Sequence, residues 1–180
     1  MTTQYPFAPS AEIFRTLISQ GVSGISKNNA ARTVIEGGKI LSVPLEGGSA
    51  CLKHRNPDLY KIRISDHGRW RQEHLGTINA IYGKSPYFAY IYPEIEKIYL
   101  ERSHGTIGEF NESLFSFVKN FLDLDGVCVS ARQMETSNPG RLAELKNEFA
   151  TKVNLNNSIL EALFRLGKNA AFLLIRKIYI

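Results

Sequence analysis

The amino-acid sequence predicts an α+β fold: a small mixed sheet with an N-terminal hairpin, covered by several C-terminal helices. Short runs of alternating apolar residues, separated by turn residues, lie early in the chain. From Asp66 onward the apolar period changes from 2 to 3.6, which is typical of amphipathic helices. Strands gathered early and helices late favour an α+β fold over repeating βαβ units. With 180 residues and a hydrophobic content of 43%, residues 1–180 are most simply a single domain.

Several short strands are expected to form the predicted sheet. Residues 10–21 read as a helix that precedes it. The clearest hairpin is "RTVIEGGKILSVPLEGG", in which two β-branched runs surround Gly37 and Gly38. "LYKIRIS" alternates apolar with basic residues and predicts a strand with one wet, positive face. Two further strands are expected at residues 22–26 and, buried, at residues 127–131.

Helices are expected over most of the remaining chain. Apolar residues recur there at helical spacing, and glycine or proline marks most of the ends. We expect a kink or break at Pro93, because proline removes one hydrogen bond from a helix interior. The predicted helices cover residues 67–82 (ended by Gly83), 86–102, 109–123 (ended near Gly126), 140–152, 157–166 and 168–178.

The formal charge of +5 and the pI near 9.2 favour an anionic partner. Basic residues concentrate in one segment, where only Asp58 and Asp66 oppose them: Lys53, Arg55, Lys61, Arg63, Arg69 and Arg71. Basic and aromatic residues do not form one interleaved stripe, so nucleic acid is a less favoured partner than a small anion. A solvated charged face is the structural alternative.

The cysteines and the N-terminus indicate a cytoplasmic protein. Cys51 and Cys128 are far apart in the sequence and lack metal-ligand spacing, which suits a reducing compartment. The N-terminus has neither a basic region nor an apolar region of the kind that signal peptides contain. The most apolar run, "AAFLLIRKIYI", is too short and too charged to span a bilayer. We therefore expect no membrane span, and the sequence predicts no particular oligomeric state.

One short stretch, "ISDHGRWRQEH" at residues 64–74, combines two histidines, two arginines and the single tryptophan. Asp66 stands where the N-cap of the predicted helix belongs. His67, Trp70, Arg71 and His74 follow at positions i, i+3, i+4 and i+7, which share one face of a helix. The pattern therefore predicts a stripe of functional side chains.

The stripe favours an anionic ligand over a metal ion. Seven residues separate the histidines by about 10 Å along a helix, too far for one zinc ion with nitrogen ligands at about 2.1 Å. We expect neither a metal nor a cofactor. A nucleotide sugar fits the length instead, with its phosphate at the helix N-terminus near Gly68.

In this interpretation Arg69 or Arg71 grips the phosphate, Trp70 stacks on a ring, and His67 or His74 acts as general base. The alternative is structural: Asp66 is only a cap, Trp70 belongs to the core and the arginines form surface ion pairs. If the functional interpretation holds, Asp66→Ala lowers the stability of the fold by about 1 kcal/mol because the helix loses its cap. Arg71→Ala then leaves stability almost unchanged but abolishes anion binding.

The stretch and its surroundings resemble the WbqC-like protein family. The likeness is strongest over "KIRISDHGRWRQEHLGTINAIYGKSPYFAYIY", and the Asp-His-Gly-x-Trp-Arg-x-x-His run is its specific part. It extends to the N-terminal "TTQYPFAPSAEIF", to the hairpin that begins at Arg32 and to the C-terminal "NLNNSILEALFRLGKNA". The pattern carries onto Asp66, His67, Gly68, Trp70, Arg71 and His74, and the hairpin match adds Arg32. Leu75 and Ala31 depart from it, since relatives often have tryptophan and asparagine there.

What the resemblance implies is a role in surface-polysaccharide (O-antigen-like) biosynthesis in bacteria. The leading hypothesis is an acyl or aminoacyl (glycine-type) transferase that acts on a nucleotide-linked amino sugar. His67 or His74 is the expected base, and Asp66, Gly68, Arg69, Trp70, Arg71 and Arg32 are the expected substrate contacts. The alternative is a non-catalytic protein that binds an anionic sugar nucleotide or, with less support, nucleic acid. The sequence names neither donor nor acceptor.

Overall fold

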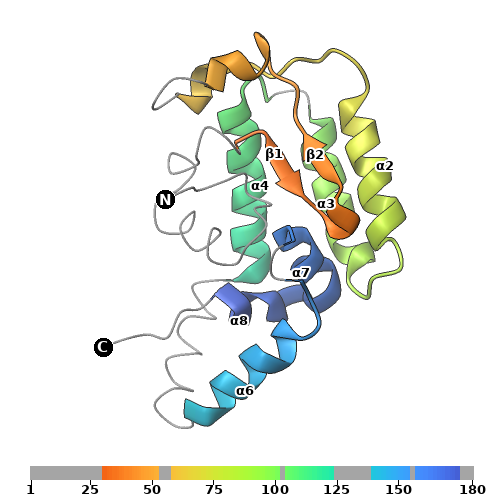
Figure 1. Ribbon diagram of the computed structural model, residues 1–180, viewed down its shortest axis with the longest axis vertical. Helices are drawn as coiled ribbons and strands as arrows, with labels where there is room; N and C mark the ends of the chain where they lie inside the picture. Colours follow the sequence, from red (N-terminus) through yellow and green to blue (C-terminus); the bar gives the residue numbers. More distant parts are fainter. Residues whose placement is uncertain (1–29, 53–57, 102–103, 124–138, 155–156, 175–180) are drawn as a thin grey trace.

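The computed structural model describes residues 30–52, 58–101, 104–123, 139–154 and 157–174 (Figure 1). These residues form a small antiparallel hairpin and several helices, most of which follow it in the sequence, so the predicted α+β class is confirmed. The helix predicted at residues 10–21 and the strands predicted at 22–26 and 127–131 lie outside the described residues.

The hairpin has the predicted position. β1 (Arg32–Val34) pairs with β2 (Ile40–Ser42) in an antiparallel register that sets Arg32 opposite Ser42. The connection contains a short 3₁₀ turn, η2 (Glu36–Gly38). Gly37 and Gly38 have φ values of 78° and 73°, which only glycine adopts without strain. This is why the glycine pair marks the turn.

The segment predicted as a third strand folds differently at its start. The Asp58 carboxylate accepts a hydrogen bond from the backbone N–H of Tyr60 and caps a 3₁₀ turn, η4 (Leu59–Lys61). Only the end of the segment is extended, where isolated bridges pair Arg63 with Thr106 and Ile64 with Leu45. The predicted alternation survives, because Leu59, Ile62 and Ile64 are buried while the intervening basic residues are exposed.

The helices lie close to their predicted positions. α3 packs against both α2 and α4, and α7 contacts α3 (Figure 1). A further 3₁₀ turn, η5 (Gly167–Ala170), joins the last two described helices, so the predicted 168–178 segment is helical as far as residue 174; residues 175–178 lie outside the described residues. The bounds are α2 (Trp70–Tyr82), α3 (Phe88–Leu100), α4 (Ile107–Leu122), α6 (Pro139–Ala150), α7 (Ile159–Leu166) and α8 (Ala171–Leu174).

Two helices differ in detail from their predictions: α3 has no break at Pro93, and α4 begins before residue 109. α3 is one continuous helix through Pro93. Proline has no N–H to donate to the carbonyl of Ala89, but both residues are exposed, so water can bond to that carbonyl. α4 begins at Ile107, because Thr106 and Glu109 form a capping box. Its end at Leu122 agrees with the predicted end at residue 123, because Asp123 has the left-handed backbone conformation that terminates helices; Gly126 lies outside the described residues.

The hairpin is attached to the helices at several points. Ser42 N–H donates to the His74 side chain in α2, and Glu36 N–H donates to the Tyr82 hydroxyl. Ser158, the N-cap of α7, donates its own N–H to the Val34 carbonyl. These bonds fix the strand that carries Arg32 relative to α2, where the predicted site begins.

Candidate functional site

The helix that carries the 64–74 stretch begins later than its sequence predicts. α2 starts at Trp70 with Arg69 as N-cap, and no side chain makes a capping hydrogen bond. The prediction that Asp66 is the cap was therefore wrong. Gly68 has a φ of 79°, and this left-handed conformation ends any helix that extends back toward Asp66. Residues 65–69 form a loop.

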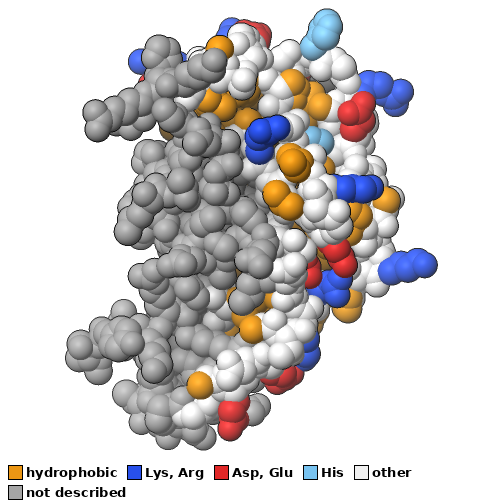
Figure 2. Space-filling view, in the orientation of Figure 1, with side chains coloured by type: hydrophobic (Ala, Val, Ile, Leu, Met, Phe, Trp, Pro, Cys, Tyr) orange, Lys and Arg blue, Asp and Glu red, His pale blue; other side chains and the backbone are white. Residues whose placement is uncertain are grey.

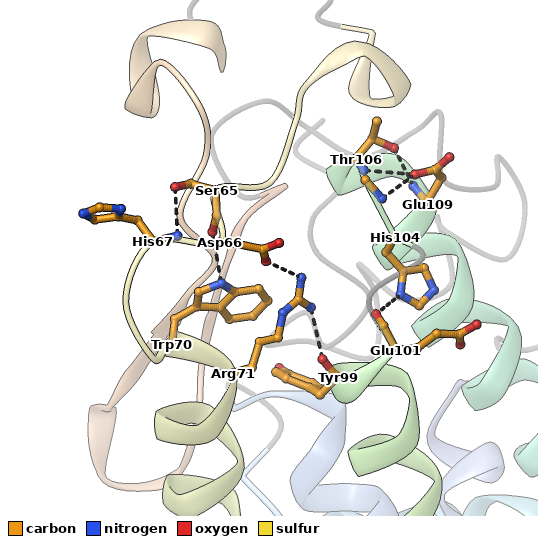
Figure 3. A network of polar contacts seen from close by, with 11 residues as sticks. Ser65, Asp66, His67, Trp70, Arg71, Tyr99, Glu101, His104, Thr106 and Glu109 are labelled. Carbon is orange, nitrogen blue, oxygen red and sulfur yellow. Dashed lines mark hydrogen bonds and ion pairs between the residues drawn. The ribbon is translucent and has the colours of Figure 1, made fainter.

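Arg71 joins this loop to the neighbouring helix (Figure 3). Its Nη2 donates to the Asp66 carboxylate at 3.1 Å, and its Nη1 donates to the backbone carbonyl of Tyr99 at 3.1 Å. The guanidinium carbon lies 4.4 Å from the centre of the Trp70 ring. The Arg71 side chain is 10% exposed, whereas that of Asp66 is 74% exposed. Arg71 therefore has a structural role.

Trp70 belongs to the core. Its indole N–H donates to the Ser65 carbonyl at 3.2 Å, and its ring packs against Tyr99 and Phe110. Only 6% of the residue is exposed. The indole therefore offers little surface on which a ligand ring can stack, in contrast to the functional interpretation of the sequence.

His74 is buried and already has a partner. Its Nε2 accepts a hydrogen bond from Ser42 N–H at 3.1 Å, so in the neutral ring the proton is on Nδ1. That Nδ1 is buried without a hydrogen-bond partner in the described part of the chain. The imidazole ring makes edge contacts with Trp70 and Tyr99. Burial lowers the pKa of His74 to about 4. The imidazole is thus held as a neutral structural group.

The His67 side chain differs from the three buried side chains described above. It is exposed and precedes the helix, and its side chain points away from Trp70 and Arg71 (Figure 3). Its backbone N–H donates to the Ser65 hydroxyl at 3.3 Å. The predicted single stripe therefore divides: Trp70, Arg71 and His74 face inward, and His67 faces water.

Two more predicted contact residues are exposed arginines. Arg69 lies at the start of α2, next to the exposed Gly68. Arg32 lies on β1, where its Nε donates to the Ser42 hydroxyl at 3.1 Å. Ser42, which lies opposite Arg32 in the hairpin, donates its N–H to His74 of α2. Arg32 is therefore separated from α2 by one strand. Arg32, His67 and Arg69 are thus predicted site residues that are exposed to water.

The described ranges show no grouping of three or more His, Cys, Asp or Glu residues arranged to hold a metal ion. Within the same ranges, no helix has both the length and the apolar character needed to cross a bilayer.

Comparison with known proteins decides the family. The model of the WbqC-like protein family matches residues 23–167, well over half of the chain. This chain belongs to the WbqC-like protein family. The sequence resemblance is thereby confirmed, and the 64–74 stretch, the hairpin and α7 all lie within the matched region. No curated protein and no solved structure matches the chain.

A second polar cluster in this WbqC-like protein was not predicted. His104 contacts the Glu101 carbonyl and the Ser113 hydroxyl, and the Glu109 carboxylate accepts from the N–H groups of Gly105 and Thr106. The Thr-x-x-Glu spacing of residues 106–109 is a readable capping-box signal. The pairing of His104 with Ser113 has no local signal, because it depends on how a loop folds against α4.

The contacts of Arg71 predict a large loss of stability in Arg71→Ala. The substitution removes a charged hydrogen bond to a buried carbonyl and a guanidinium packed on an indole, together worth about 2–4 kcal/mol. Asp66→Ala loses less, about 0.5 kcal/mol, because its carboxylate is mostly exposed. The matched control Arg69→Ala removes an exposed arginine two residues away and should change little. Urea denaturation measures all three; equal midpoints for Arg71→Ala and wild type contradict the structural role.

The environment of His74 predicts an acid-sensitive fold. In the unfolded chain His74 binds its proton near pH 6.5, whereas in the folded chain it does so only near pH 4. Between these values the unfolded state holds the extra proton, so the free energy of unfolding falls as the pH is lowered. One such group lowers the free energy of unfolding by about 3 kcal/mol over this pH range.

His74→Gln isolates this effect, since the glutamine carbonyl can accept from Ser42 N–H and does not titrate. The difference in free energy of unfolding between wild type and His74→Gln should change by about 3 kcal/mol between pH 6.5 and pH 4. The exposed His67→Gln serves as control. A difference that stays constant over this range rules out the buried, neutral imidazole.

Proposed function

We propose that this WbqC-like protein transfers an acyl or aminoacyl group, such as glycine, to the amine of a nucleotide-linked amino sugar in surface-polysaccharide biosynthesis. The observation that carries the proposal is the loop at residues 66–69. It presents an exposed histidine and an exposed arginine beside the uncapped start of α2. The loop is held by the buried Arg71, so its exposed side chains project from a fixed base.

The start of α2 suits the phosphate groups of the substrate. The side chain of the N-cap residue, Arg69, makes no capping hydrogen bond, and the first N–H groups of a helix have no partner within it. The positive end of the helix dipole favours an anion at this point. Arg69 is exposed at the N-cap itself, where its guanidinium can make two parallel hydrogen bonds to a phosphate.

His67 is the base in this proposal, because the other motif histidine already accepts from Ser42 N–H. As the sugar amine attacks the acyl carbonyl, a C–N bond forms and the bond to the leaving group breaks. His67 removes the proton from the attacking nitrogen, and the leaving group departs with the bonding electrons. We assign to Arg32, which lies on β1, a contact with a second anionic group of the substrate.

A small anion fits the surface better than nucleic acid. Figure 2 shows Lys and Arg side chains that stand apart from one another over the hairpin and the helices, without forming a continuous stripe. Binding of nucleic acid through several phosphates needs such a stripe.

A non-catalytic sugar-nucleotide binder is the second candidate. The specific observation in its favour is that three of the matched motif side chains, Trp70, Arg71 and His74, are used inside the fold. Only one imidazole of the motif then remains for chemistry.

Calorimetric titration with a UDP-linked amino sugar, combined with transfer from a glycyl thioester, tests the proposal. Arg69→Ala should weaken binding about tenfold, equivalent to about 1.4 kcal/mol. His67→Gln should bind normally and lose transfer by a factor of about 100 or more. Lys84→Ala, an exposed change at the other end of α2, is the control. Binding without transfer by wild type supports the binder instead, and normal binding by Arg69→Ala rejects the site.

A further inference from the structure

The cluster at the C-terminal end of α3 contains a serine paired with a histidine. The Ser113 hydroxyl lies 2.8 Å from His104 Nε2, and His104 Nδ1 lies 3.2 Å from the Glu101 carbonyl oxygen. A backbone carbonyl can only accept a hydrogen bond, so Nδ1 carries the proton. Nε2 then has a free electron pair and accepts from the serine O–H. Nucleophile, base and orienting acceptor thus follow one another in the order used by serine acyl-transfer enzymes.

The histidine is held in this orientation from several sides. His104 is 8% exposed, and its ring packs edge-on against Phe110. The adjoining backbone is fixed, since the Gly105 carbonyl accepts from Ile64 N–H and the Glu109 carboxylate binds the Gly105 N–H. Figure 3 shows His104 directed toward Glu101 at this junction. A base so fixed loses little entropy when it takes a proton.

Ser113, in contrast, is only partly buried on α4. Its hydroxyl is bonded to the free electron pair of an imidazole, which is the arrangement of an activated nucleophile. A purely structural serine in a helix needs no such partner, because its hydroxyl can bond to the carbonyl of the preceding turn.

We propose that Ser113 is a nucleophile that accepts the acyl group, with His104 as its base. The serine oxygen attacks the carbonyl of an acyl thioester while its proton passes to His104 Nε2. An ester bond to Ser113 forms, the C–S bond breaks, and the departing thiolate takes the proton from His104. In the second step an amine attacks the ester carbonyl: a C–N bond forms, the C–O bond to Ser113 breaks, and the proton lost by the amine passes through His104 Nε2 to the serine oxygen. The identity of this amine rests on the proposed function; the first step does not.

Labelling with a fluorophosphonate probe tests the pair, because the probe reacts with activated serines and releases fluoride. Wild type should gain one adduct, and peptide mass mapping should place it on Ser113. Ser113→Ala should gain none. His104→Gln preserves hydrogen-bonding groups on both sides but removes the base, so labelling should slow by about 100-fold or more. Ser116→Ala, an exposed serine change one turn further along α4, should react like wild type.

Thermal unfolding of each variant verifies that it is folded, and the adduct position in wild type decides the question even if a variant is not. An unlabelled wild type, an adduct on another serine, or unchanged labelling of folded His104→Gln each overturns the proposal. The experiment needs no amino sugar. Failure of the labelling is therefore distinct from failure of sugar binding at Arg69, which needs no acyl donor.

Discussion

The buried guanidinium of Arg71 is the contact on which the arrangement of the loop at residues 65–69, α2 and α3 depends. It links the loop through Asp66, the first turn of α2 through Trp70 and the end of α3 through the Tyr99 carbonyl. A charge withdrawn from water is tolerated only where hydrogen bonds and an opposite charge replace the lost hydration. The three contacts must form together, so the loop, α2 and α3 hold one relative position.

Other polar contacts extend this arrangement to the hairpin and the C-terminal helices. His74 binds Ser42 N–H, which joins β2 to α2. At the far end of the hairpin, Arg165 of α7 forms an ion pair with Glu36 at 2.8 Å. The buried Glu161 of α7 accepts from Asn154 N–H and from the Asn157 side chain. The motif at residues 66–74 is therefore partly a set of folding contacts, and the proposed function assigns ligand recognition to exposed neighbours such as Arg69.

Local signals in the sequence predicted the hairpin and most helices, because glycine turns and apolar periodicity act over a few residues. The start of α2 was wrong because Asp66 has a suitable residue type for a cap, whereas the backbone conformation at Gly68 decides where the helix begins. The roles of Arg71 and His104 could not be read from the sequence. Their partners Tyr99 and Ser113 are brought to them by packing between helices. Helical spacing correctly placed Trp70, Arg71 and His74 together but could not tell whether their shared face is inside or outside.

Side-chain NMR of the arginines tests the central claim most directly. If Arg71 is fixed by Asp66 and Tyr99 as observed, its Nη protons should give separate, slowly exchanging signals, while those of Arg69 and Arg32 exchange rapidly with water. On addition of a UDP-linked amino sugar, the Arg69 signal should shift and the Arg71 signals should stay in place. Rapid exchange at Arg71, or a ligand-induced shift there as large as that at Arg69, contradicts the assignment of Arg71 to the fold and of Arg69 to the ligand.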